Sequence, residues 1–412
     1  MLLFQMHELI RISLILCLIL LLLRKKLAIG YVMLIASAAL FLLHHMDLTS
    51  IAVTLKKTVT SPITIKLLLA LSLIRVLESI LREKNILSAM MSTAKILFKK
   101  RRAIIISMPM LIGMLPSLGG AYFSAPMVKE ATSGIQMSQE EKAFINYWFR
   151  HPWEFILPLY PGILLASAVS NIPLYNLIKA NTVYAFLLIV TGFLFAMRGV
   201  EKSSHKATNQ GSKAEQNCHH AVKKELASFL PIVTVLALVV FLHLELHHAL
   251  LAAIVPLLVL YRYRLRDIIR ITRHGFALEV IIMIFGIMLF KETMEASGAV
   301  KNLSIFFVQQ QIPLLPVICL LPFITGMLTG LTVGFVGGTF PLLISMTGGA
   351  SLANISLAFA AGFIGVLLSP VHLCLVLTKE YFKADMWGIY KKILPASAII
   401  FIAAIIEYIL LR

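Results

Sequence analysis

Residues 108–128 read MPMLIGMLPSLGGAYFSAPMV, an apolar segment that is interrupted at its centre by the turn-forming residues 116–120. A second segment, residues 321–343, reads LPFITGMLTGLTVGFVGGTFPLL and is interrupted by glycines and threonines within residues 329–338. A shift of 213 positions, from 108 to 321, matches a proline and a Gly-Met-Leu triplet between the two segments. Hydrophobicity alone does not require matched proline and glycine breaks, so the pattern indicates an internal duplication.

The broken centre of each segment predicts a re-entrant hairpin instead of a simple membrane span. A helical piece of about 10 residues is about 15 Å long, whereas the hydrocarbon core of a bilayer is about 30 Å thick. We therefore expect residues 103–128 and residues 313–346 each to enter and leave the membrane on the same side.

The overall composition is typical of an integral membrane protein. Of the 412 residues, 59% are hydrophobic and only 14% are charged. We predict an all-α membrane protein with about ten transmembrane helices and two re-entrant hairpins, because a span takes about 20 mostly apolar residues. The predicted spans are residues 9–23, 27–43, 63–81, 143–168, 175–197, 226–243, 247–261, 276–291, 352–377 and 393–411.

A hydrophilic stretch divides the chain into two halves. Residues 198–225 include SSHKATNQGSKAEQN, a composition that predicts a flexible linker. The first membrane repeat then covers residues 1–197 and the second covers residues 226–412, each with five spans and one hairpin. Because an odd number of crossings precedes the second half, it enters the membrane upside down, which makes two inverted repeats.

The basic residues predict the orientation in the membrane. Lys and Arg gather in runs such as 24–26, 99–102 and 262–273, which the ten-span arrangement places on one side. By the positive-inside rule this side is cytoplasmic, so linker 198–225 is cytoplasmic and both termini are extracytoplasmic, in an inner or plasma membrane. These loops explain the net charge of +18, so we expect the lipid bilayer, and no nucleic acid, as a partner.

Three strings carry a resemblance to a known family: residues 108–128, NYWFRHPWEFILPLYPG at 146–162 and SPVHLCLVLTKEYF at 369–382. Together they resemble the prokaryotic integral-membrane family called domain of unknown function 401, over nearly the whole chain. That family is similar to the ion-transporter superfamily of gluconate-type, citrate-type and dicarboxylate carriers, which have two re-entrant hairpins. The resemblance implies a cation-coupled anion carrier, often a dimer with an elevator motion. Both hairpin tips lack the Ser-Asn-Thr signature of dicarboxylate carriers, so the resemblance does not identify a substrate.

The tips of the two hairpins are candidate anion-binding sites. Backbone N–H groups left unpaired at helix ends need partners inside a membrane, and a bound anion supplies one. An alternative interpretation is that the glycines only allow close helix packing. The candidates are Pro116, Ser117, Gly119 and Gly120 in the first tip, and Thr329, Thr332, Gly334, Gly337, Gly338 and Thr339 in the second.

The span at 143–168 contains Asn146, Arg150, His151 and Glu154, together with Pro152, which is expected to break the helix. Ionisable residues inside a membrane are costly and indicate a functional site. Arg150 would balance an anionic substrate, and Glu154 would bind a proton or Na⁺. Alternatively, Arg150 and His151 lie at the cytoplasmic interface and Glu154 pairs with one of them.

Ser369 and His372 interrupt the otherwise apolar span at 352–377. His372 is a candidate proton-sensitive or substrate-facing donor, with a packed core histidine as the alternative. The four cysteines show no metal-ligand spacing, so no metal site is predicted. Whether a further set of histidines on the extracytoplasmic side binds anything stays open; this set is His44, His45, His243, His247 and His248.

These features predict a secondary active transporter for a small organic anion, coupled to H⁺ or Na⁺, without a cofactor and without enzymatic activity. Moving one negative charge inward against about 100 mV costs about 2.3 kcal/mol, which the movement of a cation offsets. An exporter or antiporter of another small solute is one alternative. An intramembrane lipid-modifying enzyme, with His151 and Glu154 as acid and base, is a second. The oligomeric state stays open, with a homodimer among the candidates.

Overall fold

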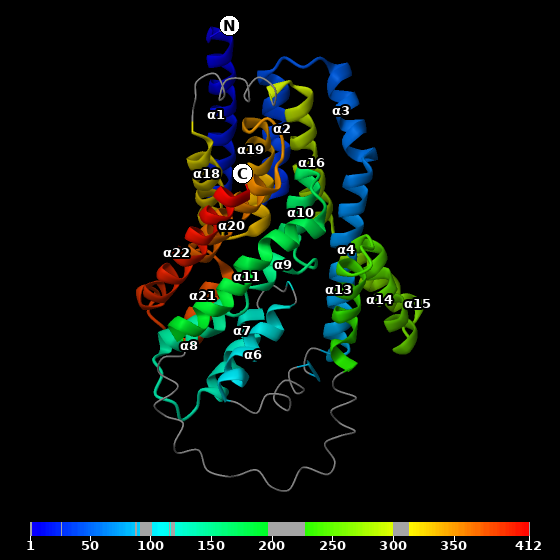
Figure 1. The fold of residues 1–412 in the computed structure, drawn as a ribbon. Helices are drawn as coiled ribbons and strands as arrows, with labels where there is room; N and C mark the ends of the chain where they lie inside the picture. The colour runs from blue at the N-terminus through cyan, green and yellow to red at the C-terminus, as the bar shows by residue number, and fades with distance from the viewer. Residues whose placement is uncertain are drawn as a thin grey trace.

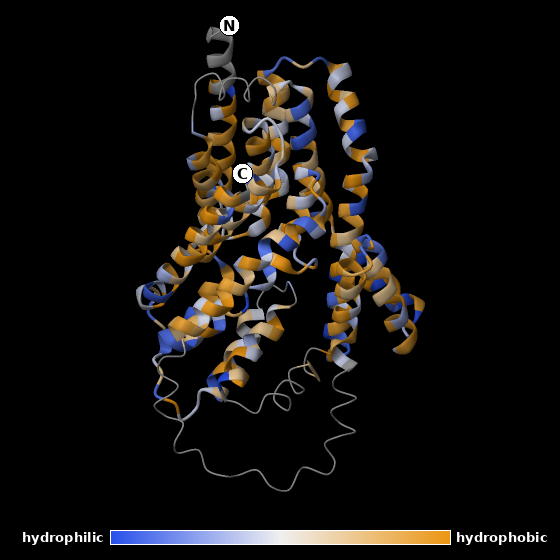
Figure 2. Cartoon of the chain, viewed as in Figure 1, coloured by the Kyte–Doolittle hydropathy of each residue, from blue (hydrophilic) through white to orange (hydrophobic). Residues whose placement is uncertain are grey.

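The computed structural model describes residues 2–25, 27–86, 89–90, 101–114, 116, 120–196, 227–299 and 313–411. Within these ranges all regular secondary structure is helical, as Figure 1 shows. Apolar residues run along most of the length of the helices (Figure 2). Five helical stretches are long and apolar enough to cross a membrane, which supports a membrane-embedded protein; they are Gln139–Ser170, Leu174–Ala196, Leu265–Ala296, Leu352–Phe382 and Met386–Leu410.

The helices pack into two bundles, and each bundle takes helices from both halves of the chain (Figure 1). The first bundle consists of α1 (Leu2–Arg24), α2 (Ile29–Leu43), α3 (Leu48–Thr60), α4 (Pro62–Glu83), the short η2 (Ala227–Phe229), α13 (Leu230–Val240), α14 (Leu246–Leu260), α15 (Leu265–Gly275) and α16 (Leu278–Ala296). The second consists of α6 (Arg101–Gly113), α7 (Gly120–Ala131), α8 (Gln139–Trp148), α9 (Trp153–Ile156), α10 (Pro161–Ser170), α11 (Leu174–Ala196), α18 (Leu314–Thr329), α19 (Thr332–Met346), α20 (Leu352–Leu368), α21 (Leu373–Phe382) and α22 (Met386–Leu411).

Both predicted hairpin segments are broken at their centres. α6 packs against α7, and α18 packs against α19. The four helices have 13, 12, 16 and 15 residues, or about 18–24 Å at about 1.5 Å per residue, so each is shorter than the hydrocarbon core of about 30 Å. Gly330, which separates α18 from α19, has a φ of +63°, a backbone conformation that suits glycine.

Two predicted spans are also interrupted. The span at 143–168 leaves the helix after Trp148 and resumes it at Trp153, next to Pro152. The span at 352–377 leaves the helix after Leu368 and resumes it at Leu373. These two interruptions, residues 149–152 and residues 369–372, are called the first break and the second break below. Pro152 signals the first break in the sequence, because proline cannot continue a helical hydrogen-bond ladder.

Two further helices lie where the sequence predicted only connections. α3 begins at Leu48 and is capped by Asp47, whose carboxylate accepts hydrogen bonds from the backbone N–H groups of Thr49 and Ser50, both at 3.2 Å. α3 carries Lys57, which lies 2.6 Å from Glu292 of α16, and this hydrogen bond raises the pKa of Lys57. α15 occupies most of the predicted basic loop 262–275. In both places the tertiary contacts stabilise helices that are too polar to be recognised as spans.

Candidate functional site

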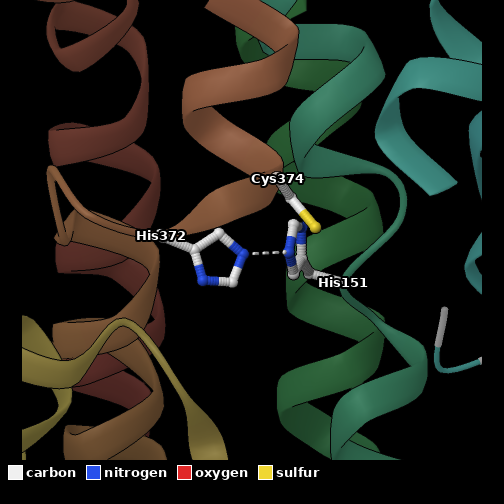
Figure 3. A group of neighbouring side chains, drawn as sticks. All are labelled: His151, His372 and Cys374. Carbon is white, nitrogen blue, oxygen red and sulfur yellow. Dashed lines mark hydrogen bonds between the residues drawn. The ribbon is translucent and has the colours of Figure 1, made fainter. Parts of the chain in front are cut away.

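The first and second breaks meet inside the second bundle. Nε2 of His151 lies 3.2 Å from Nε2 of His372, although the two residues are 221 positions apart in the chain. Figure 3 shows the two rings facing each other from separate helical elements. Both side chains are buried. The fold therefore brings together two candidates that the sequence placed in different halves.

The remaining ring nitrogen of each histidine contacts a backbone carbonyl. Nδ1 of His151 lies 2.6 Å from the carbonyl oxygen of Tyr147, and Nδ1 of His372 lies 2.7 Å from that of Gly330. A carbonyl oxygen only accepts hydrogen bonds, so Nδ1 carries the proton and donates in both rings. The two Nε2 atoms of the neutral rings therefore direct their lone pairs toward each other.

Arg150, next to His151 in the first break, is a buried cation. Only 4% of its surface is exposed, and its Nε and Nη1 atoms have no hydrogen-bond partner in the described part of the chain. Arg150 lies close enough to Glu154 and His372 to interact with both electrostatically. Because buried N–H groups without hydrogen-bond partners are costly, these groups point to a ligand that the protein binds there.

Glu154 and Thr332 add polar groups beside the two histidines. Oε1 of Glu154 lies 3.9 Å from Nε2 of His151, and the Glu154 side chain is 12% exposed. The Thr332 side chain, at the start of α19, interacts with Glu154. It also lies against α10, since a Cβ added at Gly162 would be 2.6 Å from the Thr332 Cβ. The tip of the second hairpin thus reaches the first break.

Each hairpin also packs against the break in its own half. A Cβ added at Gly113, the last residue of α6, would overlap the Arg150 carbonyl oxygen. A Cβ added at Gly330 would lie 2.9 Å from the backbone nitrogen of His372. The Tyr160 hydroxyl donates to the Gly113 carbonyl, and the Ser369 hydroxyl donates to that of Met327 at 2.6 Å. Glycine is therefore required at both tips for the backbones to approach this closely.

The remaining candidates of the first hairpin and of α8 lie around these contacts. Pro116 is half-buried between α6 and α7, and Gly120 is buried at the start of α7, whereas Ser117 and Gly119 lie outside the described residues. The Asn146 amide donates to the Ala121 carbonyl and to the Thr378 hydroxyl, both at 3.0 Å. Asn146 thus joins α7, α8 and α21.

In the second hairpin, Thr329 and Thr332 lie at the tip, while other candidates make packing contacts. The Thr329 hydroxyl donates to the Thr325 carbonyl at 2.8 Å and accepts from the Leu331 N–H at 3.3 Å, so it caps the turn. A Cβ added at Gly334 would lie 2.6 Å from the Thr329 hydroxyl.

Farther along α19, the contacts match the packing interpretation. A Cβ added at Gly337 would lie 2.7 Å from Ile287 of α16, and one added at Gly338 would lie 3.6 Å from Ile19 of α1. The Thr339 hydroxyl donates to the Phe335 carbonyl of its own helix at 2.6 Å. These residues contact the first bundle or their own helix.

Sequence reasoning missed Cys374 and Tyr147. The Cys374 sulfur and a ring nitrogen of each of His151 and His372 all lie within 4.8 Å of one another (Figure 3). The Tyr147 ring packs on the His151 ring with a centroid distance of 4.5 Å, and its hydroxyl donates to the Leu367 carbonyl at 2.9 Å. Cys374 follows His372 by two residues. This spacing indicates a shared site only when the position of the second break is known.

The five histidines that the sequence predicts on the extracytoplasmic side lie in different places. Glu245, His247 and His248 form a partly exposed group whose ligand atoms lie within 4.8 Å of one another. His243 packs edge-to-face against Tyr175 at a centroid distance of 4.8 Å. Among the described residues, neither group with metal-ligand spacing includes His44 or His45. The structure therefore does not assemble these histidines into one site.

The comparison with protein families finds one family whose model covers nearly the whole chain. A family model described as "Protein of unknown function (DUF401)" matches residues 9–411. The matched range includes both hairpins, both breaks and every residue placed around His151 and His372. No curated protein matches the chain at a significant level.

Proposed function

The chain belongs to the family described as protein of unknown function (DUF401), and we propose that it is a secondary active transporter that moves a small organic anion together with H⁺ or Na⁺. Arg150 carries this proposal, because it is a buried guanidinium with two nitrogen atoms that lack partners among the described residues. A carboxylate fits such a group, since hydrogen bonds from a guanidinium to a carboxylate are charge-assisted and stronger than those between neutral groups.

The proposal includes an architecture of ten spans and two re-entrant hairpins, in inverted repeats at 1–197 and 226–412, as in the ion-transporter superfamily. The order of the helices supports this architecture. The same order of elements occurs twice, a broken hairpin followed by a broken span. In both halves the hairpin tip packs on the break of its own half, at Gly113 with Arg150 and at Gly330 with His372. Broken helices at matching positions of inverted repeats are typical of substrate sites in secondary transporters.

The charges at the first break suggest how an anion and a cation would be coupled. Arg150 and Glu154 interact and offset one another, so the site carries no net charge before an anion binds. A bound carboxylate would leave one negative charge uncompensated in a buried place, which is costly. A proton on Glu154 or a Na⁺ ion beside it restores the balance. Glu154 is therefore the proposed residue for the coupling cation.

The division into two bundles supports a rigid-body motion. A cavity of about 750 Å³ lies where the two bundles meet, lined by Ile63 and Lys66 of α4, by Leu164 and Ser167 of α10 and by residues at the start of α14. Such a cavity leaves room for the second bundle, which carries the breaks, to move against the first. Alternating access by movement of one bundle past another is the general behaviour of repeat-built carriers.

Uptake by proteoliposomes tests the proposal directly. The purified protein is reconstituted and offered a panel of labelled mono-, di- and tricarboxylates under an imposed H⁺ gradient or an imposed Na⁺ gradient. We expect uptake of at least one carboxylate, driven by one of the gradients and lost in Arg150→Gln. Arg273→Gln, which removes an exposed arginine of α15, is the matched control and should retain uptake.

Each alternative function has its own outcome in this experiment. Flux that is driven by an opposed cation gradient would identify an antiporter or exporter. No uptake of any carboxylate, together with turnover of a membrane lipid that depends on His151 and Glu154, would replace the transporter by an enzyme. Equal uptake by wild type and Arg150→Gln would refute the anion site.

A further inference from the structure

His151, His372 and Cys374 gather three side chains that bind metals at one buried point. Their ligand atoms lie within 4.8 Å of one another, and the residues come from both breaks and from the first turn of α21 (Figure 3). We propose that these three residues bind a divalent transition-metal ion of the Zn²⁺ type. The proposed transport activity does not require this site, and the two proposals can fail separately.

The distance between the two imidazoles suits a tetrahedral metal ion. With Zn–N bonds of about 2.0–2.1 Å, two ligand nitrogens in a tetrahedral site lie about 3.3 Å apart. The two Nε2 atoms lie 3.2 Å apart. With a Zn–S bond of about 2.3 Å, the sulfur would lie about 3.6 Å from each nitrogen. The Cys374 sulfur and one ring nitrogen of each histidine already lie within 4.8 Å of one another, so a small movement of the Cys374 side chain would complete the set.

The hydrogen bonds of the two rings leave both Nε2 atoms unprotonated and able to bind a metal ion. Each Nδ1–H donates to a backbone carbonyl, of Tyr147 for His151 and of Gly330 for His372. This pattern is the usual support of metal-binding histidines, because it fixes the tautomer and orients the ring. The Tyr147 ring packs on both imidazoles, with centroid distances of 4.5 and 5.6 Å, and keeps them in place.

A metal ion explains the facing lone pairs better than a shared proton does. Two unprotonated nitrogens at 3.2 Å repel each other unless a positive charge lies between them. A proton would turn one ring into an imidazolium and would leave the Cys374 thiol unused. A divalent ion that binds the Cys374 thiolate, after the thiol releases its proton to solvent, leaves the same single positive charge and uses all three ligand atoms. Oε1 of Glu154, 3.9 Å from His151, lies near enough to offset this charge.

The types of ligand atom indicate which metal ion the site would bind. Imidazole and thiolate together suit Zn²⁺ and other late divalent ions, whereas Mg²⁺ and Ca²⁺ prefer oxygen ligands. Three protein ligands leave the fourth tetrahedral position open, as in zinc sites that bind a water or another small ligand. The inferred ion is therefore a borderline-soft divalent cation held by two nitrogens and one sulfur.

Cobalt(II) provides a spectroscopic test on the full-length protein purified in detergent. After treatment with a chelator, we expect the protein to bind one Co²⁺ per chain with a thiolate-to-metal charge-transfer absorption, and Zn²⁺ to displace it. Cys374→Ser should lose this absorption. His372→Ala should lower the affinity by more than the roughly 10- to 100-fold that follows loss of a supporting partner.

Two control variants separate this site from other groups. Cys319→Ser removes a buried cysteine of α18, and the double variant His247→Ala/His248→Ala removes the partly exposed second group. Both should keep the absorption. Melting curves without metal show whether Cys374→Ser is folded, and added Zn²⁺ should raise the melting temperature of the wild type only. Absence of the charge-transfer absorption in the wild type, or its persistence in Cys374→Ser, would refute the site and leave the transport proposal intact.

Discussion

The first and second breaks each interrupt the helical stretch that follows a hairpin, yet their chemistry differs. In the first break, Arg150 keeps two nitrogen atoms without partners in the described part of the chain. In the second break, the Ser369 hydroxyl donates to Met327 and His372 donates from Nδ1 to Gly330. The second break is therefore anchored to its hairpin by satisfied hydrogen bonds, while the first contains buried N–H groups without partners among the described residues. The two breaks together thus form an asymmetric site.

This asymmetry suggests a division of labour. The residues of the first break provide charge for a ligand, and those of the second hold a hairpin tip against it. Substitutions in the two breaks should then affect different quantities, substrate binding at Arg150 and stability at Ser369.

The largest effect is expected for Arg150→Gln. Hydrogen bonds to a charged group contribute about 1.5–3 kcal/mol each, so loss of two bonds to a carboxylate should raise the KM for uptake by roughly 100-fold or more. The melting temperature should change much less than the KM, because glutamine removes buried N–H groups that have no hydrogen-bond partner in the described part of the chain. Uptake kinetics and a melting curve measure the two quantities. A lower melting temperature with unchanged KM would show that Arg150 is a structural residue.

Alanine at the two tip glycines should break the packing in both halves. At Gly113 the added Cβ overlaps the Arg150 backbone, and at Gly330 it meets His372 in a backbone conformation with φ of +63°. Left-handed backbone costs a non-glycine residue about 1–2 kcal/mol, and the steric overlap adds to this cost. We expect lower melting temperatures for both variants, with Gly113→Ala also raising KM because it displaces Arg150. Gly298→Ala, at a glycine with nothing within 4 Å of the added Cβ, controls for strain alone.

Ser369→Ala should show whether the second break affects stability without affecting substrate binding. The substitution removes the hydrogen bond to the Met327 carbonyl and the one that the hydroxyl accepts from the Val371 N–H, and the loss of a partner for each part-buried backbone group costs about 1–3 kcal/mol. The melting temperature should fall, while KM changes by less than it does in Arg150→Gln. A change in KM as large as that of Arg150→Gln would mean that Ser369 contacts the substrate.

A surface ion pair far from both breaks should give the smallest effect. The Lys66 ammonium is hydrogen-bonded to Glu245 and holds the pKa of that carboxyl below its ordinary value. The stabilisation is therefore present above the unfolded pKa of about 4.3 and is lost as the pH falls through the lower folded pKa. The Glu245 side chain is 47% exposed, so the effect is small. Melting curves of wild type and Lys66→Met should differ slightly at pH 6 and converge in acid; a constant difference would indicate packing.

Several parts of the fold could be predicted because they depend on local sequence. Pro and Gly at 116–120 and 329–338 marked the hairpin breaks, and Pro152 marked the first break. α3 was missed because Lys56 and Lys57 make it too polar for a span, and its N-cap at Asp47 is a weak signal without tertiary contacts. The second break lacks a strong local signal, since Pro370 also suits the end of a helix.

The residues of the candidate site could also be predicted only where the local sequence is unusual. Arg150, His151, Glu154 and His372 were recognised because ionisable residues are rare inside apolar segments. Cys374 was not, because a cysteine in an apolar run is usually a packing residue. Gly337 and Gly338 were candidates by composition, and their contacts with α16 and α1 agree with the packing alternative.

The sequence by itself determined that the chain is helical and membrane-embedded, because hydrophobic length and periodic breaks are local properties. Only the tertiary structure decided that helices from both halves share each bundle, that the two breaks meet, and that His151 faces His372 at 3.2 Å. Such contacts join residues 221 positions apart. They depend on how whole helices cross, which no local pattern encodes.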